Sequence, residues 1–370
     1  MNGRSDWRRS FGLREAGVVY ALLILLGLLA GVAAARGLPN YLSPQNLGNI
    51  AYQASLVGIM GVAMTVMLIT GAFDLSVASV AALAAVVLIG LAPGIGFPLA
   101  GLAAIVTAMG IGLINGAIVQ FVGINAFIVT LGSLTAVRGL VLVLTDGRSL
   151  MVEKSGVLGQ MLAFESTRVP VFWPALVLGA VLLAWAAARR RVPAGLAGAA
   201  VAVLALYAGP GFTLAAPVIY LAAFTAIVWA MLRLTVVGRR LYAVGGNAEA
   251  ARLSGINVNA YRLGAFVLSS GAAGFAGVLF GCRLGAINPT ALQGAELTVI
   301  AAAILGGTSL FGGAGSVLKT VVGALLLFTL SNGFNVLDLG ASYQGIIEGV
   351  VVIAAAAIYT VGGRRAGVAR

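Results

Sequence analysis

Four carboxylates are the residues of this chain best placed to do chemistry, since each lies near or within an apolar segment: Asp74, Glu296, Asp338 and Glu348. Ionisable groups in such positions can relay protons or bind an ion. Asp74 can instead cap the helix that follows it, because it comes directly after a glycine-containing turn. Glu296 and Asp338 fall at expected helix ends that water can reach, and only Glu348 lies a full turn inside an apolar segment. A proton-coupled carrier in which Asp74 and Glu348 titrate therefore remains one interpretation.

Neutral polar side chains are more numerous in the apolar segments than charged ones. An uncharged polyol could pass along them by hydrogen bonding, although polar contacts that hold helices together explain them equally well. Together with Asp74, the candidate residues for a translocation path are Asn115, Asn125, Thr130, Ser133, Asn332, Asn335 and Gln344.

The composition excludes several other kinds of chemistry. There is no histidine and only one cysteine, Cys282, so the chain has no imidazole base, no His-ligated metal and no intrachain disulfide. We expect neither a catalytic residue nor a metal site. The glycine-rich stretch 306–316 lacks the Gly-Lys-Ser/Thr of a phosphate loop, and Gly313-Ala314-Gly315 lacks the third glycine of a dinucleotide fingerprint. We therefore expect no bound nucleotide.

The overall composition is typical of a membrane protein. Of the 370 residues, 61% are hydrophobic and 9% are charged, and the mean hydropathy is +1.08. This predicts an all-α, polytopic transmembrane helix bundle, with a single domain over residues 1–370. The apolar run at residues 16–35 is too long for a signal peptide, so it is expected to be the first span. About 10 to 12 membrane segments are expected, some short or broken: 17–35, 50–69, 74–92, 98–122, 126–145, 170–188, 194–209, 214–232, 263–284, 295–308, 316–334 and 343–361.

Lysine and arginine are distributed unevenly between the two sides that these segments imply. With the N-terminus inside, most of the 22 fall on the inner side, including the tail and Arg189-Arg190-Arg191. The positive-inside rule then places both termini and residues 233–262 in the cytoplasm. The net charge of +12 thus reflects membrane orientation, and nucleic-acid binding is excluded.

One polar stretch, residues 238–262, stands between long apolar segments and is called the polar island here. It contains Arg239, Arg240, Arg252 and Arg262, and Arg233 lies just upstream. Such a stretch must face water, since unpaired charges in hydrocarbon are costly. Within it, an N-cap at residue 247 and a glycine at residue 255 predict a short helix over 248–254. Its small side chains suit close contact with another protein, although a solvated loop is the other interpretation.

Two glycine-containing interruptions, 70–76 and 306–316, occupy comparable places in the two halves of the chain. Interruptions of this kind can mark discontinuous helices near a translocation path. The alternative is a tight cytoplasmic turn, in which glycine supplies the positive φ. For 306–316 we favour the turn.

Residues 238–258, GRRLYAVGGNAEAARLSGINV, closely resemble the cytoplasmic coupling loop of the permease subunits of bacterial ABC sugar importers of the ribose, xylose and galactose type. The resemblance extends to LITGAFDLSVASV at 68–80 and to the blocks 125–140, 296–316 and 332–355. In the first of these, Ala72-Phe73 stands where the family has Gly-Ile, and Ala78 stands where it has glycine. The resemblance covers most of the chain outside 146–210.

This resemblance implies a bacterial inner (plasma) membrane protein with several partners. A periplasmic sugar-binding protein delivers the sugar, a second permease chain completes a homodimer, and a cytoplasmic ABC ATPase uses ATP and Mg. This chain would bind no cofactor and would not be an enzyme. Residues 233–262 would form the coupling loop, in which the following residues contact the ATPase: Arg239, Arg240, Gly245, Gly246, Asn247, Ala248, Glu249, Ala250, Ala251, Arg252 and Gly255.

Residues 170–210 add a helical pair relative to the ribose-type members, which is similar to what xylose permeases carry. The resemblance therefore favours a pentose, xylose first. Two alternatives remain open: the proton-coupled carrier, and an ABC permease for a nucleoside or a branched-chain amino acid.

Overall fold

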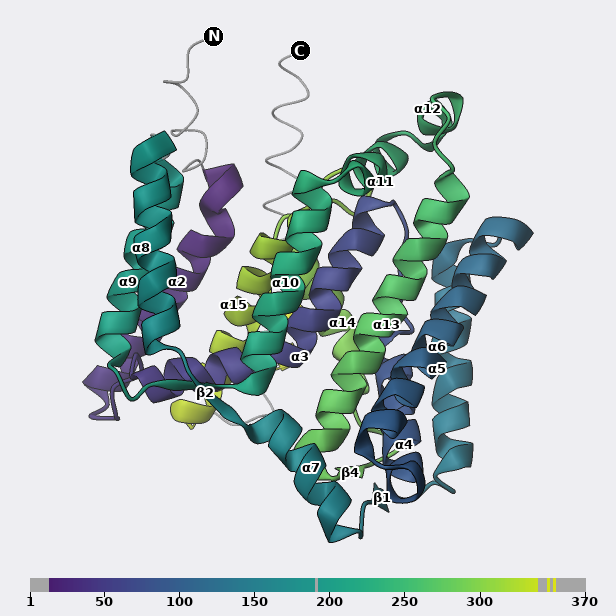
Figure 1. Ribbon diagram of the computed structural model, residues 1–370, viewed down its shortest axis with the longest axis horizontal. Helices are drawn as coiled ribbons and strands as arrows, with labels where there is room; N and C mark the ends of the chain where they lie inside the picture. Colours follow the sequence, from purple (N-terminus) through teal and green to yellow (C-terminus); the bar gives the residue numbers. More distant parts are fainter. Residues whose placement is uncertain (1–12, 190–191, 339–344, 347–348, 351–370) are drawn as a thin grey trace.

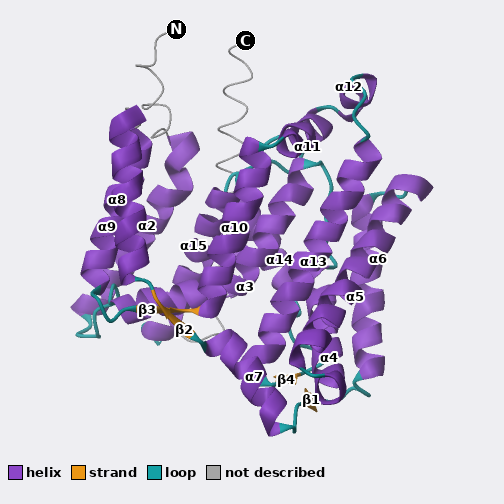
Figure 2. Ribbon diagram, viewed as in Figure 1, coloured by secondary structure: helices purple, strands orange, loops and turns teal. Residues whose placement is uncertain are grey.

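The chain folds into an almost entirely helical bundle, seen in a computed structural model that describes residues 13–189, 192–338, 345–346 and 349–350 (Figures 1 and 2). Within these residues, two short antiparallel strand pairs join β1 to β4 and β2 to β3. The prediction of an all-α polytopic bundle is confirmed.

The elements are α2 (Leu13–Ala35), α3 (Pro44–Ile69), α4 (Val77–Ile95), α5 (Phe97–Ala117), η1 (Ile118–Val122), α6 (Ala126–Leu144), β1 (Leu150–Met151), α7 (Ser155–Ser166), β2 (Arg168–Pro170), α8 (Phe172–Arg189), α9 (Val192–Ala208), β3 (Thr213–Ala215), α10 (Ala216–Leu234), α11 (Val236–Gly246), α12 (Ala248–Leu253), α13 (Val258–Leu284), β4 (Ala286–Ile287), α14 (Ala295–Leu305) and α15 (Val317–Val336).

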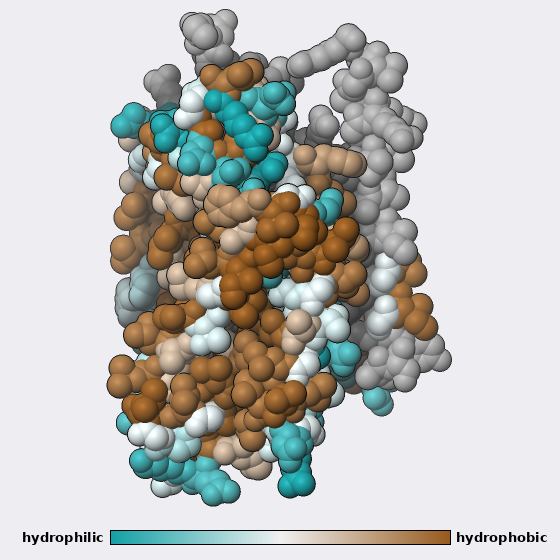
Figure 3. Space-filling model, turned by 90° about the vertical axis from the view of Figure 1, so that its right-hand side faces the viewer, coloured by the Kyte–Doolittle hydropathy of each residue, from teal (hydrophilic) through white to brown (hydrophobic). Residues whose placement is uncertain are grey.

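Nine helices within the described part of the chain are long and apolar enough to cross a membrane, and two shorter apolar helices, Ala194–Ala208 and Ala295–Leu305, accompany them. Apolar side chains form a broad band on the face shown in Figure 3, with hydrophilic residues gathered above and below it. These observations indicate a multi-pass membrane protein. The last expected segment, 343–361, lies almost wholly outside the described residues.

The core is built around α3, which is the most buried of the described spanning helices, and α4 and α15 are the next most buried. Glycine and alanine let α13 pack against α4 with its backbone in contact: a Cβ on Gly277 would lie 2.1 Å from the carbonyl oxygen of Ala81. Helices this close gain extensive van der Waals contact, which is the main packing force between helices in lipid. The small residues of α13 and α4 therefore allow these two helices to pack closely.

The polar segment 146–169 has more structure than its composition suggests. It contains α7, which buries one face through Val157, Met161 and Glu165 at four-residue spacing. Strand β2 precedes the hairpin of α8 and α9, strand β3 follows it, and the two strands pair. The two ends of this hairpin therefore lie next to each other. Helices α8 and α9 pack against each other, and in the view of Figure 1 they lie on the same side of the bundle as α2.

A buried ion pair ties three elements together at the end of the bundle opposite α11 and α12. Arg283 of α13 donates from Nε to Glu165 Oε1 of α7 at 2.8 Å, and the Tyr52 hydroxyl of α3 donates to the same oxygen at 2.5 Å. The Arg283 guanidinium also stacks 4.0 Å from the centre of the Tyr52 ring. The Glu165 side chain is only 3% exposed and that of Arg283 is 22% exposed, so each charge depends on the other for solvation. No sequence pattern predicts this pairing, because Glu165 and Arg283 are far apart in the chain.

We expect Glu165→Ala to destabilise the purified protein by about 3 kcal/mol, since removing one partner leaves a buried guanidinium without its acceptor. Unfolding in a denaturing-detergent titration would measure the loss. Arg148→Ala is the matched control: Arg148 and Asp146 are 3.9 Å apart with side chains 84% and 90% exposed, and such surface pairs contribute about 0 to 1 kcal/mol. Equal losses in both variants would contradict the assignment.

Candidate functional site

The polar island folds into two short helices at one end of the bundle, called the island end here (Figure 1, top). Thr235 caps α11, Asn247 caps α12 by accepting from Ala250 N at 3.0 Å, and Asn257 caps α13. Gly255 has φ +77, which suits glycine directly after a helix. The predicted helix is thus present with the predicted cap, although it ends at Leu253 rather than at residue 254.

The island exposes charge while it keeps a small core of its own. Val244, Ala251 and Val258 pack together and fix α12 against α11 and the start of α13. Its arginines 239, 240 and 252 are exposed, as is Glu249. Glu249 and Arg252, whose spacing would allow an ion pair, form none in the structure. The surface therefore presents its charges to solvent rather than to each other.

Two large apolar side chains that no sequence pattern singles out are exposed at the island end. Leu253, the last residue of α12, is 86% exposed, and Phe311, in the loop between α14 and α15, is 94% exposed. Neither belongs to a spanning helix. Leu253 ends a short helix and Phe311 follows Leu310, which is itself 38% exposed, so only knowledge of their exposure could have identified them. Singly exposed apolar residues are common on protein surfaces, so these two do not by themselves mark an interface.

The island contacts both interrupted segments at one point, which is called the glycine junction here: Gly71, Gly245, Gly312 and Gly313. A Cβ on Gly245 would lie 1.6 Å from the carbonyl oxygen of Ile69, the last residue of α3, and a Cβ on Gly312 would lie 2.6 Å from the carbonyl oxygen of Gly245. The backbones therefore touch. Gly313 N also donates to the Ile69 carbonyl at 2.9 Å, which satisfies an acceptor that the helix end leaves free.

One side chain reinforces the glycine junction. The Tyr242 hydroxyl of α11 donates to the Gly315 carbonyl at 2.9 Å. Burial raises the pKa of the Tyr242 phenol, so it remains a neutral donor at physiological pH. Of the two interruptions, 306–316 is a loop at the island end that joins α14 to α15.

The other interruption, residues 70–76, runs from the glycine junction into the bundle. Asp74 is fully buried: its Oδ1 accepts from Ser76 N at 3.0 Å and from Ser76 Oγ at 2.6 Å, and its Oδ2 accepts from Ser269 Oγ at 2.8 Å. Asn115 Nδ2 of α5 donates to Ser76 Oγ at 3.2 Å. Ser269 lies about three turns into α13, roughly 16 Å from its start. Residues 70–76 therefore run from the end of α3 to the start of α4 inside the bundle. The carboxylate of Asp74 links them to α13 and, through Ser76, to α5.

The other candidate path residues are spread through the bundle. Asn125 caps α6, Thr130 donates to the carbonyl of Ala126, and Asn332 exchanges side-chain hydrogen bonds with Asn46. Ser133 is half-buried and Asn335 is exposed. The structure brings together only Asp74 and Asn115 among them. Gln344 and Glu348 lie outside the described residues.

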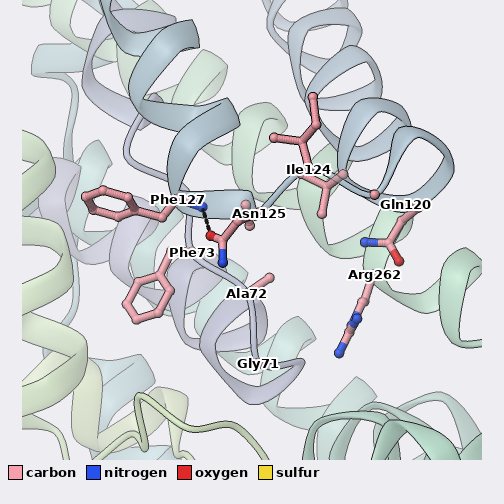
Figure 4. A pocket seen from close by; sticks show the side chains of 11 residues that line it. Gly71, Ala72, Phe73, Gln120, Ile124, Asn125, Phe127 and Arg262 are labelled. Carbon is pink, nitrogen blue, oxygen red and sulfur yellow. Dashed lines mark hydrogen bonds between the residues drawn. The ribbon is translucent and has the colours of Figure 1, made fainter.

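A cavity of about 470 Å³ opens next to the break that leads to Asp74 (Figure 4). Its walls come from residues 71–73, from η1, from the start of α6 and from Arg262 in the first turn of α13. The polar side chains on its wall are those of Gln120, Asn125 and Arg262, and no carboxylate lines it. The cavity is therefore rich in hydrogen-bond donors and carries positive charge.

Comparison with known proteins relates this architecture to transport. The family model described as "Branched-chain amino acid transport system / permease component" matches residues 46–356. No solved structure matches the chain.

Several curated relatives cover nearly the whole chain. The ribose import permease protein RbsC of Escherichia coli (strain K12) is 32% identical over 362 residues, 96% of each chain. The xylose transport system permease protein XylH of Haemophilus influenzae is 32% identical over 374 residues, 92% of this chain and 96% of the relative. The D-allose transport system permease protein AlsC of Escherichia coli (strain K12) is 30% identical over 92% of this chain and 90% of its own. These matches confirm the resemblance seen in the sequence: the chain belongs to this family of transport permeases, and its relatives carry sugars.

Proposed function

We propose that this chain is the membrane-spanning permease subunit of an ATP-driven importer, and that it carries a monosaccharide into the cytoplasm. The observation that carries the proposal is the glycine junction, where the exposed island touches both the end of α3 and the loop before α15. An ATPase that binds the island can move these elements, because no flexible side chain separates the backbones. The island end faces the cytoplasm in this proposal.

The family membership supports the choice of partners. In this proposal a cytoplasmic ABC ATPase, which uses ATP and Mg, docks on α12 and on the arginines of α11 and α12, and the exposed Leu253 and Phe311 supply apolar contacts. A second copy of this chain completes the path in the bacterial inner membrane, and a periplasmic sugar-binding protein delivers the sugar. This chain binds no cofactor itself and catalyses no reaction.

Xylose is the first sugar to test. The α8–α9 hairpin supports this choice, because the xylose permeases that the sequence resembles carry such a pair. The identities to ribose permeases, 31 to 34%, and to xylose permeases, 32 to 33%, overlap, so they favour neither pentose. A branched-chain amino acid is the cargo that the family description favours as an alternative.

Asp74 and Glu348 are the residues that would have to titrate in a proton-coupled carrier, and of the two only Asp74 lies within the described residues. It already accepts three hydrogen bonds from its own chain and lines no cavity that the structure describes. Its contacts favour a positioning role, in which it fixes the break against α13.

The energy source is tested with proteoliposomes that contain this chain, its ATPase and the sugar-binding protein. We expect uptake of labelled xylose or another pentose only when ATP is present on the ATPase side, and no effect when a protonophore collapses the proton gradient. Stimulation of ATP hydrolysis across a panel of pentoses, hexoses and branched-chain amino acids identifies the cargo. Uptake that needs a proton gradient and no ATPase would refute the proposal.

Gly245→Ala tests the glycine junction. The added methyl group would lie 1.6 Å from the Ile69 carbonyl oxygen, so α11 must move away from α3. We expect the ATPase still to bind and hydrolyse ATP, because α12 and its Arg252 are unchanged. Sugar uptake should fall at least about tenfold, a change of roughly 1.4 kcal/mol in the coupled step.

Gly264→Ala in α13 is the matched control, because a Cβ there meets nothing within 4 Å. It should transport like the unmodified protein, and both variants should insert equally into the membrane. Normal uptake by Gly245→Ala would show that the junction does not transmit the ATPase cycle.

A further inference from the structure

The cavity beside Arg262 has the features of an anion site that the transport function does not use. The Nε atom of Arg262 is buried and has no hydrogen-bond partner. No acid lies among the residues that line the cavity. Arg262 is half-buried at its wall, and an anion in the cavity would compensate the charge of its guanidinium, although Nε itself is closed to solvent.

Further donors face the same space. The side-chain oxygen of Asn125 accepts from Phe127 N at 2.9 Å, which leaves its amide nitrogen on the cavity side (Figure 4). Gln120 lies across from it, near Arg262. The cavity also contains the N-terminus of α6, a 19-residue helix, whose unpaired N–H groups and dipole favour an anion.

The position of the cavity indicates where the anion comes from. It lies where the spans Phe97–Val122, Ala126–Leu144 and Val258–Leu284 begin or end, which is the level of lipid headgroups. Large apolar side chains are exposed beside it on η1 and α6: Phe121, Val122, Phe127 and Ile128. Acyl chains could lie against these side chains while the headgroup enters the cavity. Basic pockets between transmembrane helices are known to bind anionic headgroups in this way.

We propose that this cavity binds a phosphate ester, and that its source is the headgroup of an anionic membrane lipid. Arg262 would make the charge-assisted contact, with Gln120 and Asn125 as neutral donors. The opposite wall is formed by residues 71–73, which connect the glycine junction to Asp74. A bound phosphate would therefore contact both the break and the first turn of α13.

The test uses the purified, delipidated chain in neutral detergent, with thermal stability as the readout, because a ligand that binds the folded state raises the melting temperature. Short-chain phosphatidylglycerol, the matching diacylglycerol without phosphate, and inorganic phosphate are titrated separately. We expect phosphatidylglycerol to stabilise at a concentration at least about tenfold below that of inorganic phosphate, and diacylglycerol to have no effect.

Arg262→Gln should weaken the phosphatidylglycerol effect at least about tenfold. Arg148→Gln, an exposed arginine at the opposite end, should behave like the unmodified protein. If Arg262→Gln fails to fold, Gln120→Ala replaces it, and a several-fold weakening is expected. Equal potency of inorganic phosphate would overturn the lipid source. Unchanged lipid binding in the Arg262 or Gln120 variant, or equal binding of diacylglycerol, would overturn the site.

Discussion

The contact between Gly245 and the carbonyl oxygen of Ile69 is the constraint on which the rest of this structure depends. A side chain at position 245 cannot coexist with the end of α3 at its observed place. The same carbonyl accepts from Gly313 N, so one acceptor at the end of the most buried span joins the polar island to the loop before α15. Because α3 is packed on nearly all sides, a shift of α11 cannot be absorbed locally and must move other helices.

From this contact a continuous set of interactions leads into the bundle. Directly after α3 the chain passes Gly71 and reaches Asp74, whose carboxylate holds Ser76 and Ser269. These contacts connect the island end to α13 and, through Ser76 and Asn115, to α5. At the opposite end, the Arg283–Glu165–Tyr52 cluster fixes α13 to α7 and α3. Helix α13 is thus held at one end by this cluster and near its middle by the contact between Ser269 and Asp74.

Much of this fold could be predicted from the sequence, because the length and apolar composition of a span are local properties. The island helix was predictable for the same reason: Asn247 and Gly255 act on their own neighbours. Helix α7 was not, since its apolar face is short and includes Glu165, whose burial makes sense only once Arg283 is beside it. The two interruptions were visible as glycine-containing stretches, but their meeting at Gly245 depends on how α3, α11 and α15 pack. The Arg262 cavity depends on three separate segments and left no linear pattern.

Hydrogen–deuterium exchange of the assembled transporter, with and without a non-hydrolysable ATP analogue, tests most directly whether the glycine junction links the ATPase to the membrane path. We expect the analogue to change amide exchange in residues 236–246, and in the same state to change it in residues 69–73 and 308–315. Changes confined to residues 247–255, with 69–73 and 308–315 unaffected, would contradict this account.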